Sequence, residues 1–171
     1  MTMRKLFLLS FLVVALAGLA PAGIQTHGFD CITNNSAGDC AIGEAQLFMD
    51  VIWDPNNTGF GPATIGANEI FFRFRNTGPA MAVVEQIFFE GIGGVLNLGI
   101  YNDLGVSFHQ DVKCKQGVCE PDPGNLPGGN VYSFVADDSY SADPDAPTNG
   151  IGAGEQLGIL FSIAPETYAD I

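Results

Sequence analysis

Residues 69–90 read Glu-Ile-Phe-Phe-Arg-Phe-Arg-Asn-Thr-Gly-Pro-Ala-Met-Ala-Val-Val-Glu-Gln-Ile-Phe-Phe-Glu, and this stretch decides the fold class. Alternate residues from Ile70 to Phe74 are apolar and share one side, because successive side chains of a strand point to opposite faces. Asn76-Thr77-Gly78-Pro79 has the composition of a turn, and apolar alternation resumes at Val83. We predict two antiparallel strands joined by a tight loop, at the centre of a β-sandwich.

Several other short segments have the alternation of a strand, and they are separated by glycine- and proline-rich loops. The predicted strands are Glu44–Trp53, Val95–Tyr101, Gly105–Val112, Val131–Ala136 and Gln156–Ile163. The predicted loops are 23–43, 114–130 and 137–154. After the first 22 residues no window has a strong helical period. The fold class is therefore all-β: a single antiparallel β-sandwich of jelly-roll type with about seven or eight strands.

The N-terminus has the three parts of an export signal. Arg4-Lys5 is basic, Leu6–Leu16 is apolar, and Ala20-Pro21-Ala22 is a small-residue cleavage site. The apolar run is shorter than the roughly 20 residues that span a bilayer, so we predict a signal peptide rather than a membrane helix. Residues 1–22 form the predicted signal and residues 23–171 form one domain.

The chain is strongly acidic, with 19 Asp and Glu against 6 Lys and Arg and a formal net charge of −13. Two of the six cations lie in the predicted signal, so the exported part is more acidic still. Such a surface repels nucleic acid and anionic lipid, so neither is an expected partner. We expect no insertion into a membrane once the signal is removed.

Four cysteines form two close pairs, Cys31 with Cys40 and Cys114 with Cys119. An even number in an exported chain predicts disulfides. Three connectivities exist, and we favour the two local bonds because short loops cost least to close. A four-thiolate zinc site is the alternative, but neither pair has the two-residue spacing of a zinc knuckle.

Carboxylates and amides crowd the predicted loop 137–154, and these oxygen ligands suit calcium. The candidate ligands are Asp137, Asp138, Asp143, Asp145 and Asn149. The same residue types are common in turns, and the spacing does not match a helix–loop–helix calcium motif. Calcium is the one cofactor that the sequence suggests.

Aromatic side chains could form a platform on which sugar rings stack, as in many carbohydrate-binding sandwiches. Tyr101, Tyr132 and Tyr140 are the candidates. Trp53 shares the predicted strand face of Leu47 and Val51, so we expect it in the core.

Residues for catalysis are sparse. His109 has no nucleophile elbow nearby, and His27 lies in a loop, so we expect His109 to be a surface residue of a strand. Glu85 and Glu155 could serve as the two carboxylates of a glycoside hydrolase, but any acidic sandwich offers such a pair. We therefore expect the protein not to be an enzyme.

Six phrases, in order along the chain after the predicted signal, resemble the PEP-CTERM (exosortase-sorted) family of bacterial exported proteins. They are Phe29–Ser36, Ala41–Leu47, Phe74–Pro79, Gly105–Phe108, Pro123–Asn130 and Gly154–Phe161. The resemblance implies a secreted or surface β-sandwich of a Gram-negative bacterium, linked to extracellular polysaccharide and the biofilm matrix. It supplies no active-site residues.

Members of that family end in a further strand region, a Pro-Glu-Pro motif, an apolar helix and a basic tail. This sequence ends at Tyr168-Ala169-Asp170-Ile171 without those features, so we expect either a truncated form or a released protein. The predicted function is that of an exported, non-enzymatic structural or adhesive protein, stabilised by calcium and able to self-associate through strand edges. A carbohydrate-binding module for extracellular polysaccharide is the alternative, and a hydrolase is third.

Overall fold

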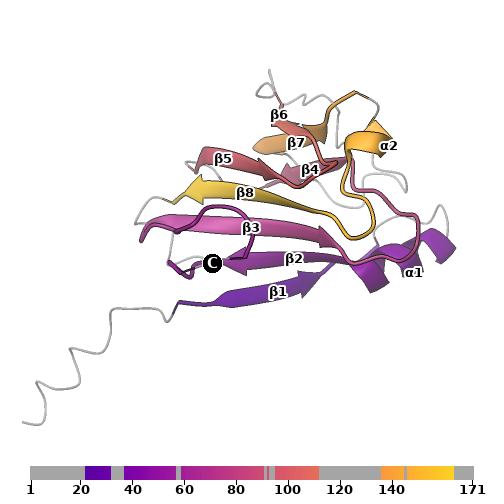
Figure 1. Cartoon of the computed structure of the whole chain (residues 1–171), viewed down its shortest axis with the longest axis horizontal. Coiled ribbons are helices and arrows are strands. Elements are labelled where there is room, and N and C mark those ends of the chain that lie inside the picture. The colour runs from indigo at the N-terminus through magenta and orange to yellow at the C-terminus, as the bar shows by residue number, and fades with distance from the viewer. Residues whose placement is uncertain are drawn as a thin grey trace, which may run out of the picture.

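The computed structural model describes residues 22–31, 37–56, 59–90, 92, 95–111, 136–144 and 146–163. These residues form a five-stranded and a three-stranded antiparallel sheet (Figure 1). In spatial order the first holds β1 (Ile24–Gly28), β2 (Leu47–Ile52), β3 (Glu69–Asn76), β8 (Gln156–Ser162) and β5 (Leu96–Asn102). The second holds β4 (Gln86–Phe89), β7 (Asp138–Ala142) and β6 (Phe108–Gln110). Two helices complete the described part, α1 (Ala37–Gln46) and α2 (Ala146–Asn149).

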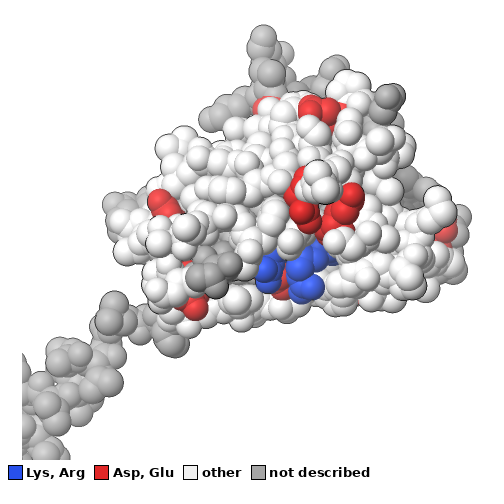
Figure 2. Space-filling view, viewed as in Figure 1, with Lys and Arg blue, Asp and Glu red and all other residues white. Residues whose placement is uncertain are grey.

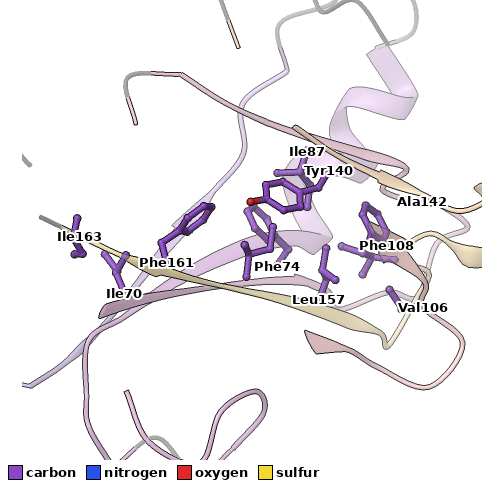
Figure 3. Packing of buried hydrophobic residues seen from close by; sticks show 12 residues of the cluster. Ile70, Phe74, Ile87, Val106, Phe108, Tyr140, Ala142, Leu157, Phe161 and Ile163 are labelled. Atoms are coloured by element: carbon purple, nitrogen blue, oxygen red, sulfur yellow. The ribbon is translucent and has the colours of Figure 1, made fainter. Parts of the chain in front are cut away.

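The two sheets pack face to face around one apolar core, to which both contribute (Figure 3). Phe161 of β8 lies at its centre and makes edge-on ring contacts with three other aromatic side chains, Phe72, Phe89 and Tyr140. The alternation predicted for the last strand is confirmed, because its apolar side chains on one parity are all buried. They are Leu157, Ile159, Phe161 and Ile163. The all-β sandwich is therefore confirmed.

The predicted central hairpin is wrong. β3 pairs with β2 and β8, whereas β4 pairs with β7 in the other sheet. The chain crosses between sheets after β3 because both strands have an apolar face, and each buries it against the opposite sheet. Sequence alternation identified both strands but could not tell pairing side by side from packing face to face. The chain crosses again from β4 to β5 in the five-stranded sheet, and from β5 to β6 in the three-stranded sheet. Successive strands that alternate between two sheets are the chain path of a jelly roll.

The prediction that residues 23–43 form a loop is also wrong, because this segment contains β1 and most of α1. The predicted strand Glu44–Trp53 begins three residues later, at Leu47. Alanine, Glu44 and Gln46 favour a helix, and Asp39 in its first turn suits the helix dipole. Tertiary contacts anchor the helix end: the buried Gln46 side chain bonds both backbone groups of Ala80.

The predicted loop 137–154 holds β7, the central strand of the three-stranded sheet, and α2. Its sequence Asp-Ser-Tyr-Ser-Ala is too polar to suggest a buried strand, yet Ser139 and Tyr140 are both buried. The Tyr140 hydroxyl bonds Asp138 of the same strand and Asn97 of β5 in the other sheet. No buried side-chain nitrogen or oxygen of the described residues lacks a hydrogen-bond partner, so the burial of these polar side chains is tolerated. Residues 1–21 of the predicted signal peptide, and residues 131–135 of the strand predicted over Val131–Ala136, lie outside the described residues.

Candidate functional site

The five-stranded sheet has an outer face, which is the face turned away from the three-stranded sheet. Part of it carries a second apolar cluster of Ile52, Phe71 and Leu160, covered by Ile65 from the β2–β3 connection. Gly158 is required there, because a Cβ at this position would lie 2.1 Å from the ring of Phe71. This cluster closes one end of the outer face and leaves polar residues exposed beyond it.

Those polar residues form what we call the arginine cluster: Thr26, Asp50, Arg73 and Arg75, supplied by β1, β2 and β3. Register places Thr26, Asp50 and Arg73 side by side on three adjacent strands. Gly158 and then Tyr101 continue the same line across β8 and β5. Arg73 and Arg75 are the Lys and Arg residues of the described chain, so the blue atoms in Figure 2 are theirs, and the same face also carries red carboxylates.

Both arginines bind one carboxylate, that of Asp50, which is only 1% exposed. Arg75 donates from Nε at 2.6 Å and from Nη2 at 2.9 Å, and Arg73 donates from Nε at 2.9 Å. Arg73 Nη2 lies 2.8 Å from the same carboxylate, and Thr26 Oγ1 donates at 2.7 Å. The guanidinium of Arg75 also lies over the ring of Phe48, 5.7 Å from its centroid.

These contacts set the charge of the cluster. Burial by itself raises the pKa of Asp50, but hydrogen bonds from Arg75, Thr26 and Arg73 outweigh it and lower the pKa to about 2. The hydrogen bond to Asp50 likewise raises the pKa of Arg75 above its ordinary value. At neutral pH the cluster therefore holds two positive charges and one negative charge.

The sequence reasoning missed this cluster. Arg73 and Arg75 are two residues apart, so they share one face of a strand. The strand that contains Asp50 is predicted from the apolar residues of its opposite face, and nothing within that strand marks Asp50 as their partner. Two alternate cations on one strand and one anion on its neighbour are a cross-strand charge pattern that could have indicated it.

The predicted sugar platform does not assemble from the described residues. Tyr101 lies half-buried on the outer face, where its ring packs edge-on against Phe71. Tyr140 is fully buried between the sheets, so its ring is not accessible to a sugar. Tyr132 lies outside the described residues. Trp53 is half-buried beside Gly23 rather than part of either core cluster.

The buried Tyr140 hydroxyl joins the two sheets. It donates to Asp138 at 2.7 Å and accepts from Asn97 of β5 at 2.8 Å. Gln110 of β6 donates to the same Asp138 carboxylate at 2.8 and 2.9 Å. Burial, and then the contact with Asp138, raise the pKa of Tyr140 well above its ordinary value.

Of the described candidate calcium ligands, Asp137, Asp138 and Asp143 lie in β7 or directly beside it, and Asn149 lies in α2. Asp138 bonds Tyr140 and Gln110, and the Asp137 carboxylate accepts from the Ile92 amide at 3.1 Å. Asn149 donates to the Pro144 carbonyl at 2.8 Å, and Asp145 lies outside the described residues. Across the described chain, no three His, Cys, Asp or Glu side chains gather in a way that could hold a metal ion. Calcium binding stays a prediction, which melting temperatures in chelator and in millimolar calcium test directly.

His109 lies on β6 and is 53% exposed at its side chain, as expected for a surface strand residue. Its Nδ1 lies 2.8 Å from Asp143, and its Nε2 lies 3.5 Å from Asp111. Ser107 donates to Asp143, not to the histidine. Hydrogen bonds from Ser107 and then His109 lower the pKa of Asp143. The carboxylate therefore stands between serine and histidine, which is not the order of a nucleophilic triad.

The two glutamates considered for hydrolysis belong to different sheets. Glu85 is exposed just before β4, and its carbonyl accepts from the Ala142 amide. Glu155 is half-buried just before β8, and its carboxylate accepts from the Gly152 amide at 2.7 Å. Glu155 therefore has a local role in ordering its turn.

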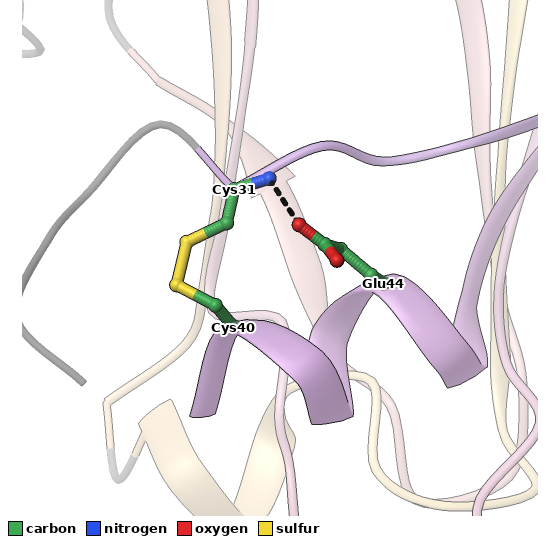
Figure 4. The surroundings of a disulfide bond; sticks show 3 residues. All are labelled: Cys31, Cys40 and Glu44. Carbon is green, nitrogen blue, oxygen red and sulfur yellow. Dashed lines mark hydrogen bonds between the residues drawn. A yellow bond between two sulfur atoms is a disulfide. The ribbon is translucent and has the colours of Figure 1, made fainter. Parts of the chain in front are cut away.

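The predicted disulfide between Cys31 and Cys40 is confirmed (Figure 4). It ties the segment after β1 to the first turns of α1. Glu44, one helical turn further on, accepts a hydrogen bond from the Cys31 amide at 3.1 Å. Cys114 and Cys119 lie outside the described residues.

The free edges of the five-stranded sheet carry exposed apolar side chains. β1 pairs only with β2 and β5 only with β8 within the described part of the chain. Ile24 on β1 is 54% exposed, and Leu96 and Leu98 on β5 are 63% and 44% exposed. Edges with these properties can accept a strand from another chain.

No family model matches the chain, and the searches of curated proteins and of solved structures each found no match. Among the described residues, no helix combines the length and the apolar character needed to cross a lipid bilayer.

Proposed function

We propose that this is an exported, non-enzymatic structural or adhesive protein of the cell envelope or extracellular matrix, which associates through the edges of its sheets. The observation that carries the proposal is the exposure of Leu96 and Leu98 on edge strand β5. Exposed leucines beside backbone groups available for pairing favour strand addition.

Export is supported by two features. The first 22 residues have the pattern of a signal peptide. The bond between Cys31 and Cys40 is typical of oxidising compartments. The resemblance to PEP-CTERM proteins supports a location at the surface or in the biofilm matrix of a Gram-negative bacterium. Detection of the protein in the culture medium or on intact cells tests this part.

Analytical ultracentrifugation over a wide concentration range tests the association. We expect the wild type to form dimers or larger species, and Leu98→Lys to remain monomeric because a charge on the edge blocks pairing. Leu104→Lys is the matched control: Leu104 is 94% exposed in the turn after β5, away from the edge. A strictly monomeric wild type, or equal loss of association in both variants, contradicts the proposal.

A carbohydrate-binding module is the second candidate, because Tyr101 lies half-exposed on the outer face in line with Arg73. Affinity electrophoresis in gels that contain soluble matrix polysaccharides tests it. We expect retardation of the wild type and of Tyr101→Phe, and normal migration of Tyr101→Ala, since the ring supplies the stacking surface. Absence of retardation in every gel removes this candidate.

A further inference from the structure

The arginine cluster has more positive charge than its structural role requires. One arginine is enough to neutralise the buried Asp50, yet Arg73 and Arg75 both bind it. They are also the two cations of the described chain, in a protein of net charge −13. Among the described residues, Asp50 is the one carboxylate within ion-pair distance of either guanidinium. Two positive charges therefore share one ion-paired carboxylate in this cluster, which leaves a net positive charge of one on its four residues.

Hydrogen-bond donors remain available on both arginines. A guanidinium carries five N–H donors, and Asp50 engages only Nε and Nη2 of each residue. Nη1 of each therefore has no partner in this cluster. No buried side-chain nitrogen of the described residues lacks a hydrogen-bond partner, so these Nη1 groups reach solvent. The side chains of Arg73 and Arg75 are 19% and 30% exposed, which leaves their tips accessible.

The guanidinium groups of Arg73 and Arg75 are held in place without a bound ligand. Asp50 accepts hydrogen bonds from both arginines, and the guanidinium of Arg75 also packs over the ring of Phe48. Residues two apart on a strand are about 7 Å apart on one face, so both guanidinium groups can face one ligand. Preorganised arginines lose little side-chain entropy on binding, and their planar fork matches the two oxygens of a carboxylate.

The surroundings narrow the class of ligand. Tyr101 lies two strands from Arg73 on the same line, about 10 Å away at ordinary strand spacing. An aromatic ring and an arginine pair at that separation suit a sugar chain that bears a carboxylate. Carboxylates also lie on this face (Figure 2), so a densely charged polyanion is repelled. An isolated carboxylate on an otherwise neutral chain is the better match.

We propose that Arg73 and Arg75 form a binding site for the carboxylate of a sparsely charged, uronate-bearing saccharide. This site does not depend on self-association through the sheet edges. It is distinguished from the second candidate function by its dependence on the ligand's carboxylate rather than on a neutral sugar ring.

The test is a titration of the wild-type protein followed by NMR of the arginine Nε–H groups. The probe is a xylo-oligosaccharide that bears a single glucuronate branch. We expect it to shift the Arg73 and Arg75 signals, while its methyl ester, which lacks the charge, and acetate each bind at least tenfold more weakly. Equal binding of the ester or of acetate, or unmoved arginine signals, overturns the proposal.

Two variants provide a second test of this binding site. Arg75→Gln leaves Asp50 paired with Arg73 and Thr26, so we expect a folded protein that binds the branched probe at least tenfold more weakly. Glu85→Gln changes one charge at an exposed position of the other sheet and should bind as the wild type does. Unchanged binding by Arg75→Gln overturns the proposal. Arginine signals that shift with protein concentration alone also overturn it, because the cluster then contacts a second copy.

Discussion

The two faces of the five-stranded sheet bury opposite kinds of side chain. The inner face is apolar, and Phe161 packs there among aromatic rings from both sheets. The outer face buries a charge, Asp50, and surrounds it with donors from two neighbouring strands. The inner face follows from the alternation within single strands, whereas the outer face exists only once β1, β2 and β3 are in register. The stability of the inner face depends on how well its apolar side chains fill space. The stability of the outer face depends on whether the buried charge of Asp50 keeps its hydrogen-bond donors.

The largest effect should come from the inner face. Phe161→Ala removes a ring that is 1% exposed, so we expect a loss of about 3–5 kcal/mol in the free energy of unfolding. Urea denaturation followed by tryptophan fluorescence measures it. Leu104→Ala, at a position 94% exposed, should change stability by less than about 0.5 kcal/mol. A small loss at Phe161 would mean that the inner face is not tightly packed.

Asp50→Ala tests the outer face and should cost about 3 kcal/mol, because it leaves two arginines without their shared anion. The pKa of Asp50 falls from 3.8 to about 2 on folding. The contribution of this carboxylate is therefore complete above about pH 4 and is lost as the pH falls through 2. The difference between wild type and variant, measured by denaturation at several pH values, should shrink over that range. A pH-independent difference would show that charge is not the cause, and Asp30→Ala is the exposed control.

Gly158→Ala should cost about 1–3 kcal/mol, since the new methyl group meets the buried ring of Phe71. Gly28 is the matched control on the same sheet, because a Cβ there has no heavy atom within 4 Å. Thermal melting of the two alanine variants compares them. Equal melting temperatures would mean that Phe71 does not cover Gly158.

The smallest expected effect is that of Tyr140→Phe, which keeps the ring and removes the hydroxyl between the sheets. Asp138 and Asn97 each lose a hydrogen bond, so we expect a loss of about 1 kcal/mol. The same denaturation measurements detect it. A cost as large as that of Phe161→Ala would mean that polar bonds, as well as volume, hold the two sheets together.

Elements whose own side chains supply their stability could be predicted from the sequence, and elements held by residues far away in the chain could not. The strand ending at Ile163 was predicted almost to the residue, because a buried strand with alternate Leu and Ile has few other interpretations. The sequence does not predict β7, because its polar side chains Asp138 and Ser141 are satisfied by Gln110 and Asp111, residues that only the folded sheet brings beside them. The helix α1 is not predicted because its apolar residues show only a weak helical period. The helix is held instead by the hydrogen bonds of the Gln46 side chain to Ala80.

The candidate site was predicted least well, for a related reason. Tyr101 was selected as a single aromatic residue, and the structure places it on an accessible face. Arg73 and Arg75 were visible as an alternating pair, but their meaning depends on Asp50, more than 20 residues earlier. Information about pairs of strands is absent from the pattern of any one strand.

The position of β8 has a consequence for when the protein can fold. It is the last described strand in the chain, yet it lies inside the five-stranded sheet, between β3 and β5. Glu69 pairs with Ser162, so the sheet closes only after contacts form across most of the chain. Such long-range pairing is slow. For a protein that is exported, as we propose, this order means that the sheet stays incomplete until its C-terminal part has also crossed the membrane.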